Sequence, residues 1–481
     1  LFRSIDNISF CENNVVVEYG KVKKINKFTK ILMENYVLDI ENKTLSNYIK
    51  YNTKGQDAFT KSVGEIKNIK INKTNEGKDI IITPTKGKDV IISLNEHNQI
   101  IAYSNENVKK IEDSFLYDNE EIAKINLPNV EEIGNRFLYC NENLTSINLP
   151  KVETIGSRFL YSNEKLSEIY LPNVHSVGSD FLYENRGLEK IDLPKIQRID
   201  DHFLSHNKKI KKISFLNLIS MGNSFLSANE VISQVNLPNL EEIGDSFLHF
   251  NKNLTKINLP KARIIGTNFL IKDEGLTEID LPNVEDIGAY FLADNKKIRK
   301  INFKNVKIIG SFFLSDNQIL DEITLPNVRK IIGGFLLDNK SLKTVRLPNV
   351  EEIGINFLYS NALLEEIYLP KVEEIDNYFL YNNENLTKID LPNARIIGGD
   401  FVHRNKNLVE VYLPKIKIID ALRIFSSNEL KYADVPLKLL KGICTKSQFQ
   451  ILKRANLNYK LKLKLEKKIK NKNSLIQENI K

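Results

Sequence analysis

The sequence predicts a repeat solenoid of the α/β type, in which about fifteen 22-residue units stack through short parallel strands into one curved sheet. Two observations predict this fold. Phenylalanine recurs every 22 residues from Phe115 to Phe401, fourteen times in succession without an insertion. Thirteen of the 14 prolines, from Pro128 to Pro436, lie on a second lattice with the same period. A phase kept this long indicates a unit that stacks on copies of itself, with a β-rich cap before the repeats and a helical, basic cap after them.

The segment at each repeat boundary has the pattern of a short strand. In the copy around residue 147, Leu144, Ile147 and Leu149 follow L-x-x-I-x-L, the strand signature of leucine-rich repeats. Because side chains alternate along a strand, Ile147 and Leu149 should point inward, whereas Ser146 and Asn148 should face solvent. Stacked coils then place each strand ~4.8 Å from the next in a parallel sheet.

The other constant columns of the repeat also have physical roles. Phe and the residue after it, which is Leu except at Val402, fill the interior. A recurring glycine, as at Gly134, suits a corner with φ > 0, and Asp200 at the same position tolerates that region better than most residues. Four residues after each Phe stands Asn, replaced once by Asp273. This column predicts a hydrogen-bonded ladder that satisfies backbone groups at the corner.

The repeat as a whole resembles the BspA-like (Treponema pallidum-type) leucine-rich repeats. The resemblance is clearest from Leu149 to Ile169 and covers roughly residues 101–436. Where commoner repeats have Asn three residues after the last strand leucine, this chain has an aliphatic residue, as at Val130 and Val152. The resemblance implies a non-enzymatic protein-protein interaction module, mostly found in bacterial or protist surface proteins that mediate adhesion. It implies no particular ligand, because the fold hosts many unrelated functions.

Residues 1–100 do not follow the lattice, so we predict three parts: 1–100, 101–436 and 437–481. The first part should be a β-rich or α+β cap of unassigned family that covers the first coil. Strands are expected over residues 15–19, 79–83, 89–94 and 99–103, and a helix over residues 28–36.

The C-terminal part carries the excess of positive charge in the chain. Residues 437–481 hold 13 basic and 2 acidic residues, whereas residues 101–436 hold 40 and 47. A helix over residues 445–456 and a strand over residues 459–465, where Lys and Leu alternate, predict a cap with solvated lysines. The alternative is contact with an anionic membrane or a nucleic acid. The candidates for that contact are Lys460, Lys462, Lys464, Lys467 and Lys468.

The sequence shows no pattern of a catalytic, metal or cofactor site, so we expect no enzyme and no cofactor. G-x-S-x-G, Walker A and G-x-G-x-x-G motifs are absent. His202 and His206 flank Phe203 at a corner, without the Glu of an H-E-x-x-H motif, so no metal site is expected. The 3 cysteines are far apart, which excludes a zinc module and a dense disulfide framework. A catalytic N-terminal domain would need a polar cleft in residues 1–100 and is disfavoured.

The expected location is secreted or at the cell surface, with a cytoplasmic scaffold or effector as the alternative. No apolar run reaches the ~20 residues that span a bilayer. The chain begins at Leu1 rather than Met, which is compatible with a removed export signal.

A protein partner, such as a host or cell-surface protein, is expected on the outward strand column of the concave sheet, where the repeat is free to vary. In the middle coils this column holds small polar residues, whereas the last coils hold Tyr and Arg, which often carry binding energy. Drift on a solvated sheet is the alternative. The predicted contact residues are Arg346, Glu366, Tyr368, Lys388, Asp390, Glu410, Tyr412 and, nearer the N-terminus, Tyr170.

A second column, two residues after Phe, is rich in tyrosine. It comprises Tyr117, Tyr139, Tyr161 and Tyr183 in consecutive coils, then Tyr359 and Tyr381. At one coil spacing the rings could stack as a ladder. Packing within the array is the expected role, and an exposed aromatic stripe is the alternative.

Overall fold

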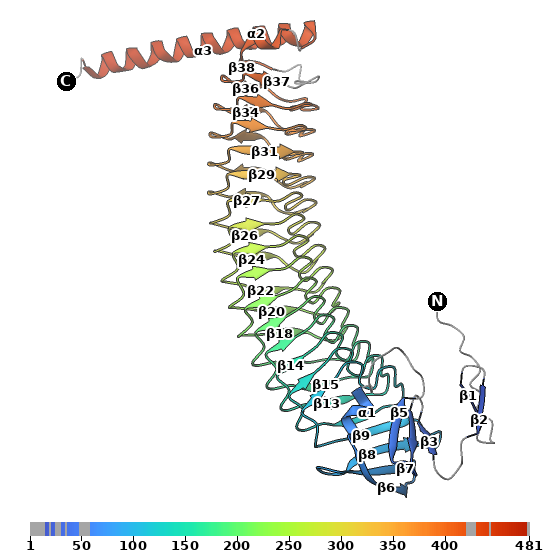
Figure 1. Ribbon diagram of the computed structural model, residues 1–481. Coiled ribbons are helices and arrows are strands. Elements are labelled where there is room, and N and C mark those ends of the chain that lie inside the picture. Colours follow the sequence, from blue (N-terminus) through green and yellow to red (C-terminus); the bar gives the residue numbers. More distant parts are fainter. Residues whose placement is uncertain are drawn as a thin grey trace. The chain divides into compact units, whose positions relative to one another are not determined.

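The computed structural model describes residues 15–18, 21–24, 30–33, 36–47, 58–419, 430–441 and 444–478. The chain forms two compact units, Leu1–Ile210 and Lys211–Lys481, and each is described by itself (Figure 1). Both contain coils of a parallel β-solenoid with about 15 turns in all, which confirms the predicted fold class. The division into 1–100, 101–436 and 437–481 stays a prediction.

The first unit begins with small antiparallel sheets. Strand β1 (Val15–Glu18) pairs with β2 (Lys21–Lys24), while β3 (Lys30–Met33), β4 (Tyr36–Asp39) and β5 (Thr44–Asn47) form a second sheet. The strand predicted at 15–19 is confirmed by β1, although residue 19 lies outside the described residues. The helix predicted over 28–36 is wrong where the structure describes it, because β3 and β4 form a hairpin that buries alternate side chains such as Met33 and Leu38.

The N-terminal cap continues directly into the repeats. Strands β7 (Gly77–Pro84), β8 (Val90–Asn95) and β9 (Ile100–Ser104) confirm the predicted meander, and β6 (Ile66–Lys73) adds a strand that was not predicted. Strand β9 then pairs in parallel with β11 (Lys124–Asn126), the first outer strand of the repeats. Strand β9 therefore pairs with the strand edge of the first coil, which would otherwise be exposed. Covering this edge is the role expected of a cap.

A short helix closes the core beneath this cap. Helix α1 (Ala58–Val63) buries Phe59, whose ring centroid lies 5.3 Å from that of Tyr103 and 6.0 Å from that of Phe115. The ring centroid of Tyr103 also lies 5.5 Å from that of Phe115, so the core of the cap continues to the first phenylalanine of the 22-residue lattice.

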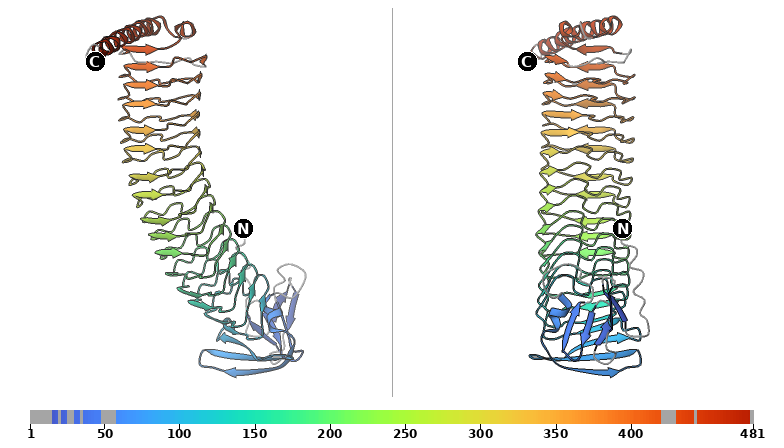
Figure 2. Two further views of the ribbon diagram at one scale, coloured as in Figure 1. Left: turned by 90° about the vertical axis from the view of Figure 1, so that its left-hand side faces the viewer. Right: turned by 45° about the vertical axis from the view of Figure 1, so that its right-hand side comes forward.

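Most coils contribute a strand to each of two parallel ladders, one of which was not predicted (Figure 2). The predicted ladder consists of three-residue strands at the L-x-x-I-x-L segment. The other consists of two-residue strands, extended to four residues in β29 and β31, that end near the recurring glycine. In the first unit the three-residue strands are β11, β13 (Ser146–Asn148) and β15 (Glu168–Tyr170). The shorter strands there are β10 (Lys110–Ile111), β12 (Glu132–Ile133), β14 (Thr154–Ile155), β16 (Ser176–Val177) and β17 (Arg198–Ile199).

The second unit repeats this arrangement. Its three-residue strands are β18 (Lys212–Ser214), β20 (Gln234–Asn236), β22 (Lys256–Asn258), β24 (Glu278–Asp280), β26 (Lys300–Asn302), β28 (Glu322–Thr324), β30 (Thr344–Arg346), β32 (Glu366–Tyr368), β34 (Lys388–Asp390), β36 (Glu410–Tyr412) and β38 (Tyr432–Asp434). Its other strands are β19 (Ser220–Met221), β21 (Glu242–Ile243), β23 (Ile264–Ile265), β25 (Asp286–Ile287), β27 (Ile308–Ile309), β29 (Lys330–Gly333), β31 (Glu352–Ile355), β33 (Glu374–Ile375), β35 (Ile396–Ile397) and β37 (Ile418–Ile419).

The interior of the coils follows the predicted alternation. In β13, Ile147 is buried, and Ser146 and Asn148 on either side of it are exposed. The lattice phenylalanines are buried and stack along the array, as in Phe335 and Phe357, whose ring centroids are 5.3 Å apart and nearly parallel. Each coil therefore supplies the same volume at the same height.

The glycine column does not have the predicted positive φ. The only described glycines with positive φ are Gly64, Gly77, Gly87 and Gly334, and only the last lies in the repeats. In the column itself, a Cβ added to Gly178 would lie 2.7 Å from the backbone nitrogen of Ser157 in the preceding coil. Glycine is therefore needed because two coils approach closely, and not because of a left-handed backbone.

Positive φ occurs instead at side-chain-bearing residues around each phenylalanine. Around Phe137, for example, Arg136, Leu138 and Cys140 have φ of 58°, 49° and 55°. A strand would send two consecutive side chains to opposite faces, whereas this alternation of handedness lets Phe137 and Leu138 both be buried. The Leu138 N–H also donates to the Phe115 carbonyl of the preceding coil (2.9 Å).

The predicted asparagine ladder is confirmed. Asn361 is buried, and its Nδ2 donates to the Leu336 carbonyl (3.0 Å) while its backbone N–H donates to Asn383 Oδ1 (2.8 Å). Asp273 interrupts the column: its Oδ1 accepts from the Asn251 N–H (3.0 Å), but its Oδ2 is buried without a partner. Burial raises the pKa of the Asp273 carboxyl well above its usual range.

Two helices close the C-terminal end of the second unit. Helix α2 (Leu437–Leu440) is followed by α3 (Lys446–Glu478), which contains residues 446–456 of the helix predicted over 445–456. The strand predicted over 459–465 is wrong, since α3 continues through it. Neither Gly nor Pro occurs between residues 446 and 478, so nothing ends the helix there. The buried Leu452 and Ala455 cover the last coil, as a cap should.

Candidate functional site

The predicted contact residues lie on adjacent strands of the second unit. We define the strand face as the outward side chains of β30, β32, β34, β36 and β38. Strands β32, β34, β36 and β38 form one parallel sheet in register. One column of the face is Arg346, Tyr368, Asp390, Tyr412 and Asp434, and the other is Thr344, Glu366, Lys388, Glu410 and Tyr432. These two columns of the strand face therefore contain all seven residues that were predicted as contacts in this region, on adjacent strands.

The face is open at one end and partly covered at the other. Tyr368 is 58% exposed, and Arg346 and Glu366 are also exposed. Lys388, Asp390, Glu410 and Tyr412 are half-buried. The predicted residues thus form an accessible group and a shielded group.

Helix α3 covers the face at Tyr412. The ring of Tyr459 on α3 lies 5.0 Å from that of Tyr412 between centroids, and Asn458 Nδ2 donates to the Lys431 carbonyl (3.1 Å). The Tyr412 hydroxyl donates to Glu410 Oε2 (2.8 Å). Burial, followed by this hydrogen bond to a carboxylate, raises the pKa of Tyr412. Tyr412 is therefore held in place before any partner arrives.

Burial also shifts the pKa of two acidic groups of the face. Burial raises the pKa of Asp390 and of Asp434, and the positive charges of Lys388 and Lys460 respectively oppose the shift. Partly desolvated carboxylates of this kind have already lost some of their water.

Sequence analysis missed the last coil and the helix at this face. Tyr432, Asp434 and Tyr459 were not predicted to belong to it. One step of 22 residues from Tyr412 leads to Asp434, so the lattice could have found that position. The contribution of Tyr459 could not be found this way because α3 does not follow the lattice.

Tyr170, the remaining predicted contact residue, belongs to the other unit. It lies on β15 of the first unit and is 56% exposed. The strand face belongs to the second unit and does not include Tyr170, so the role of Tyr170 as a contact residue stays a separate prediction.

The second tyrosine column stacks as predicted. Ring centroids are 4.9 Å apart between Tyr117 and Tyr139 and 4.8 Å apart for the next two pairs, up to Tyr183. Tyr117 at the end of the row is 43% exposed, and the other three are half-buried. Burial raises the pKa of all four hydroxyls, and for Tyr139 to about 12. The rings contact one another face to face, so the row serves packing more than it offers ring faces to a ligand.

The histidines that sequence analysis considered have separate partners. His202 Nδ1 lies 3.1 Å from Asp180 Oδ1, whereas the ring of His206 lies 5.0 Å from that of Tyr183 between centroids. In the described part of the chain, no group of three or more His, Cys, Asp or Glu side chains is arranged to hold a metal ion.

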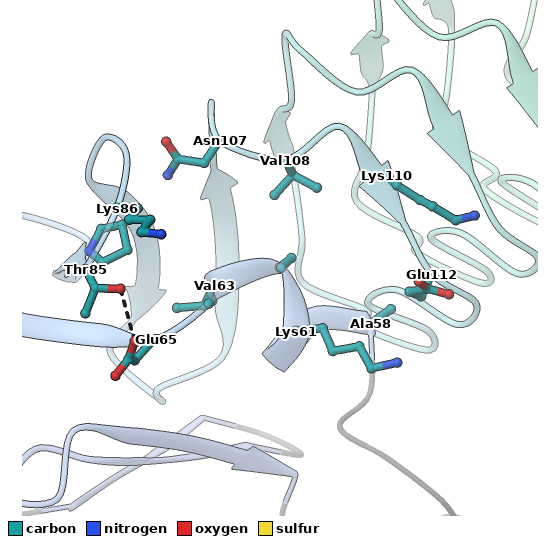
Figure 3. A pocket seen from close by; sticks show the side chains of 13 residues that line it. Ala58, Lys61, Val63, Glu65, Thr85, Lys86, Asn107, Val108, Lys110 and Glu112 are labelled. Atoms are coloured by element: carbon teal, nitrogen blue, oxygen red, sulfur yellow. Dashed lines mark hydrogen bonds between the residues drawn. The ribbon is translucent and has the colours of Figure 1, made fainter.

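A polar pocket of about 440 Å³ lies in the N-terminal cap, between the end of α1 and the first coil (Figure 3). Its charged side chains do not converge: Lys86 lies on the opposite side from Lys61 and Lys110, and Thr85 Oγ1 donates to Glu65 Oε2 (3.2 Å). The pocket is the kind of cleft that a catalytic N-terminal domain would need, but its charges are mixed and point apart.

The hydroxyl groups beside this pocket serve the cap. Ser62 Oγ donates to the Phe59 carbonyl (2.6 Å) and lies 2.6 Å from the Tyr103 hydroxyl. Asn105 Nδ2 donates to the same hydroxyl (2.9 Å). Burial raises the pKa of Tyr103 to about 12, so this hydroxyl stays protonated and is a poor base. The network holds α1 against β9.

The five lysines predicted to contact an anionic surface divide into two groups on α3. Lys462 Nζ lies 4.8 Å from the centre of the Tyr432 ring, and Lys460 interacts with Asp434. Lys464, Lys467 and Lys468 are exposed farther along the helix. The described helices include none with the length and apolar character needed to cross a membrane.

The repeats match the model of a known repeat family. The family model described as BspA type leucine rich repeat region matches residues 95–211, 197–319, 241–364 and 307–431. A leucine-rich repeat protein from Bacteroides ovatus is similar, with 18% identity, a TM-score of 0.46, and coverage of 79% of this chain and 97% of that one. A leucine rich cell surface protein from Faecalibacterium prausnitzii has 17% identity, a TM-score of 0.37, and coverage of 73% and 94%. The pneumococcal vaccine antigen PcpA has 15% identity, a TM-score of 0.33, and coverage of 80% and 96%. No curated protein matches the chain.

Proposed function

Because the chain belongs to the BspA-type leucine-rich repeat family, we propose that it is a non-enzymatic protein-binding protein whose principal contact surface is the strand face. The accessible residues Arg346, Glu366 and Tyr368 would make the first contacts. Lys388, Asp390, Glu410 and Tyr412 would line the side next to α3.

The observation that carries the proposal is the exposure of Tyr368 on a regular ladder. More than half of this large side chain lies in water, 58%, and it stands next to Arg346 in the register of the repeats. Tyr and Arg are enriched among residues that dominate binding energy, and a packed sheet holds them with little backbone freedom to lose. The neighbouring Tyr412 is already fixed by α3 and Glu410, which lowers the cost of ordering that side of the face.

The proposed setting is the cell surface or the secreted fraction, with a role in adhesion or host contact. This part of the proposal is supported by the family resemblance. The alternative is a cytoplasmic scaffold or effector whose basic tail contacts a membrane or a nucleic acid. That alternative concerns the exposed lysines of α3 and not the strand face.

The test is a pull-down with the immobilised full chain, followed by titration of each retained protein against variants. We expect Tyr368→Ala to weaken binding of the partner by about 30-fold or more, the usual effect at a residue that dominates an interface. Arg346→Ala should weaken it in the same direction. A further comparison with and without residues 437–481 separates contacts made by the tail.

Tyr378→Ala is the matched control, because Tyr378 is 41% exposed in the same unit but lies outside the strand face. Partners that bind Tyr368→Ala and Tyr378→Ala as tightly as the unchanged chain would contradict the proposed surface.

A further inference from the structure

Helix α3 bears an exposed apolar ridge that is separate from the strand face. Leu457, Leu461, Leu465 and Ile469 follow one another at intervals of four residues and are 59%, 51%, 61% and 59% exposed. Residues at this interval form a row that winds by ~40° per step around a helix. The four side chains therefore form one continuous ridge about 18 Å long.

The other side of α3 already packs on the last coil. Leu452 and Ala455 are buried, and Asn456 Nδ2 donates to the Val435 carbonyl (3.2 Å). Tyr459 contacts Tyr412 on the strand face. The ridge is thus not a part of the cap's own core, and its exposure calls for another explanation.

Lysines border this ridge. Lys464 and Lys468 each follow a ridge residue, Leu461 and Leu465, by three positions, so they are its neighbours on the helix surface, and both are exposed. From residue 446 to residue 478 the chain holds 10 basic and 2 acidic residues. An apolar ridge bordered by lysines is complementary to a surface with negative charge outside and hydrocarbon beneath it.

Two other occupants fit these observations less well. A second copy of α3 would bring its own lysines against these lysines, and like charges repel. A nucleic acid would be attracted by the lysines, but single strands gain their further affinity by stacking on aromatic rings, whereas the ridge is aliphatic. An anionic lipid surface uses both the lysines and the apolar ridge.

We propose that α3 binds peripherally to the surface of an anionic lipid bilayer, with the ridge Leu457, Leu461, Leu465 and Ile469 at the boundary between headgroups and hydrocarbon. Lys464, Lys467 and Lys468 contact the headgroups. No described helix is suited to span the bilayer, so the contact is made from one side. This surface differs from the strand face, and the inference does not rest on the proposed protein-binding function.

The experiment is co-sedimentation of the full chain with phosphatidylcholine vesicles, with and without phosphatidylserine. Binding is expected only with phosphatidylserine and should fall as salt is raised. The double variant Leu461→Ser, Leu465→Ser should weaken binding about tenfold or more, because its apolar contact is lost. Lys464→Glu with Lys468→Glu should weaken it at least as much at low salt.

The controls are the same changes at exposed positions in the repeats. Leu216 is 56% exposed, so Leu216→Ser repeats the loss of an exposed leucine, and Lys252→Glu repeats the charge reversal. Both should bind vesicles like the unchanged chain, and circular dichroism should show an unchanged fold for every variant.

Three outcomes would overturn the inference. The first is no binding to phosphatidylserine vesicles at low salt. The second is equal binding by the leucine double variant, which would leave charge alone as the cause. The third is tight binding of polyuridylic acid that depends on the lysines, together with no lipid binding, which would assign α3 to nucleic acid instead.

Discussion

Ile367 and Tyr368 are neighbours on β32, but they belong to two different regions of the molecule. Ile367 belongs to the buried interior of the coils, and Tyr368 belongs to the exposed strand face. Ile367 is 1% exposed, and its column holds only Ile or Val from Ile125 to Val411. Tyr368 is 58% exposed, and its column changes from Arg to Tyr to Asp within three coils. A residue type that is constant from coil to coil therefore marks the residues that build the array. Residues available for recognition are found where the regularity ends.

The largest expected effect is on the interior. Phe357 is fully buried and stacks between Phe335 and Phe379, with centroid distances of 5.3 Å to each. We expect Phe357→Ala to lower the free energy of unfolding by about 3–5 kcal/mol, because a cavity is left between coils. Guanidinium denaturation measures this loss.

Tyr368→Ala is the comparison for that measurement. We expect it to change the free energy of unfolding by less than about 0.5 kcal/mol, since exposed side chains contribute little to stability. Equal losses in the two variants would break the distinction between the two regions.

A somewhat smaller effect is expected in the asparagine ladder. Asn361→Ala leaves the Leu336 carbonyl and the Asn339 N–H without the partners that Asn361 supplies. At about 1–2 kcal/mol for each of the two buried groups left unpaired, a loss of about 2–4 kcal/mol is expected. Hydrogen exchange should quicken at Asn339 and its neighbours in the same coil.

Asn258→Ala tests whether the loss of stability depends on the place of the asparagine in the buried ladder and not on the side chain alone. Asn258 lies on β22 with an exposed side chain, so its replacement should cost less than about 0.5 kcal/mol. A cost like that of Asn361→Ala would show that the ladder has no special role.

The smallest of the three effects has the opposite sign. Asp273→Asn should restore the missing donor of the ladder and raise the free energy of unfolding by about 1–3 kcal/mol at neutral pH. Burial raises the pKa of Asp273 in the folded chain, so the folded state keeps a proton that the unfolded state releases. Stability is therefore lost as pH rises from the unfolded pKa, near 4, toward the folded pKa, and the gain from Asp273→Asn grows over the same window.

Denaturation of both chains from acidic to neutral pH measures this gain. Asp321→Asn, at an exposed position, is the control and should show no such growth. A gain that is constant with pH would mean that Asp273 is not protonated in the folded chain.

The lattice predicted most of the fold because a 22-residue period constrains every coil alike. It located the strands, the buried Phe-Leu pairs and the asparagine ladder. It failed at Gly178 and its equivalents because glycine serves two purposes, a left-handed backbone or a close approach, and sequence does not separate them. It also failed to predict the second ladder, since most of its strands have two residues and are too short to show a period.

At the candidate site, the 22-residue period predicted residues of the repeats up to Tyr412, but it could not predict the contribution of α3. Leu461, Leu463 and Leu465 fit the two-residue period of a strand, while Leu457, Leu461 and Leu465 also fit a helical row, so the local pattern was ambiguous. The contact between Tyr459 and Tyr412 joins a helix to a repeat that does not resemble it. No periodic argument could have found that Tyr412 is shielded.

The alternation of handedness around each phenylalanine also restricts how such a chain can evolve. Inserting one residue before Phe137 would move Leu138 to a position of the other handedness and turn it out of the core. Inserting 22 residues returns every side chain to its place and adds a coil. A change of length that keeps this geometry therefore adds or removes whole 22-residue units, and the number of units sets how much surface is offered.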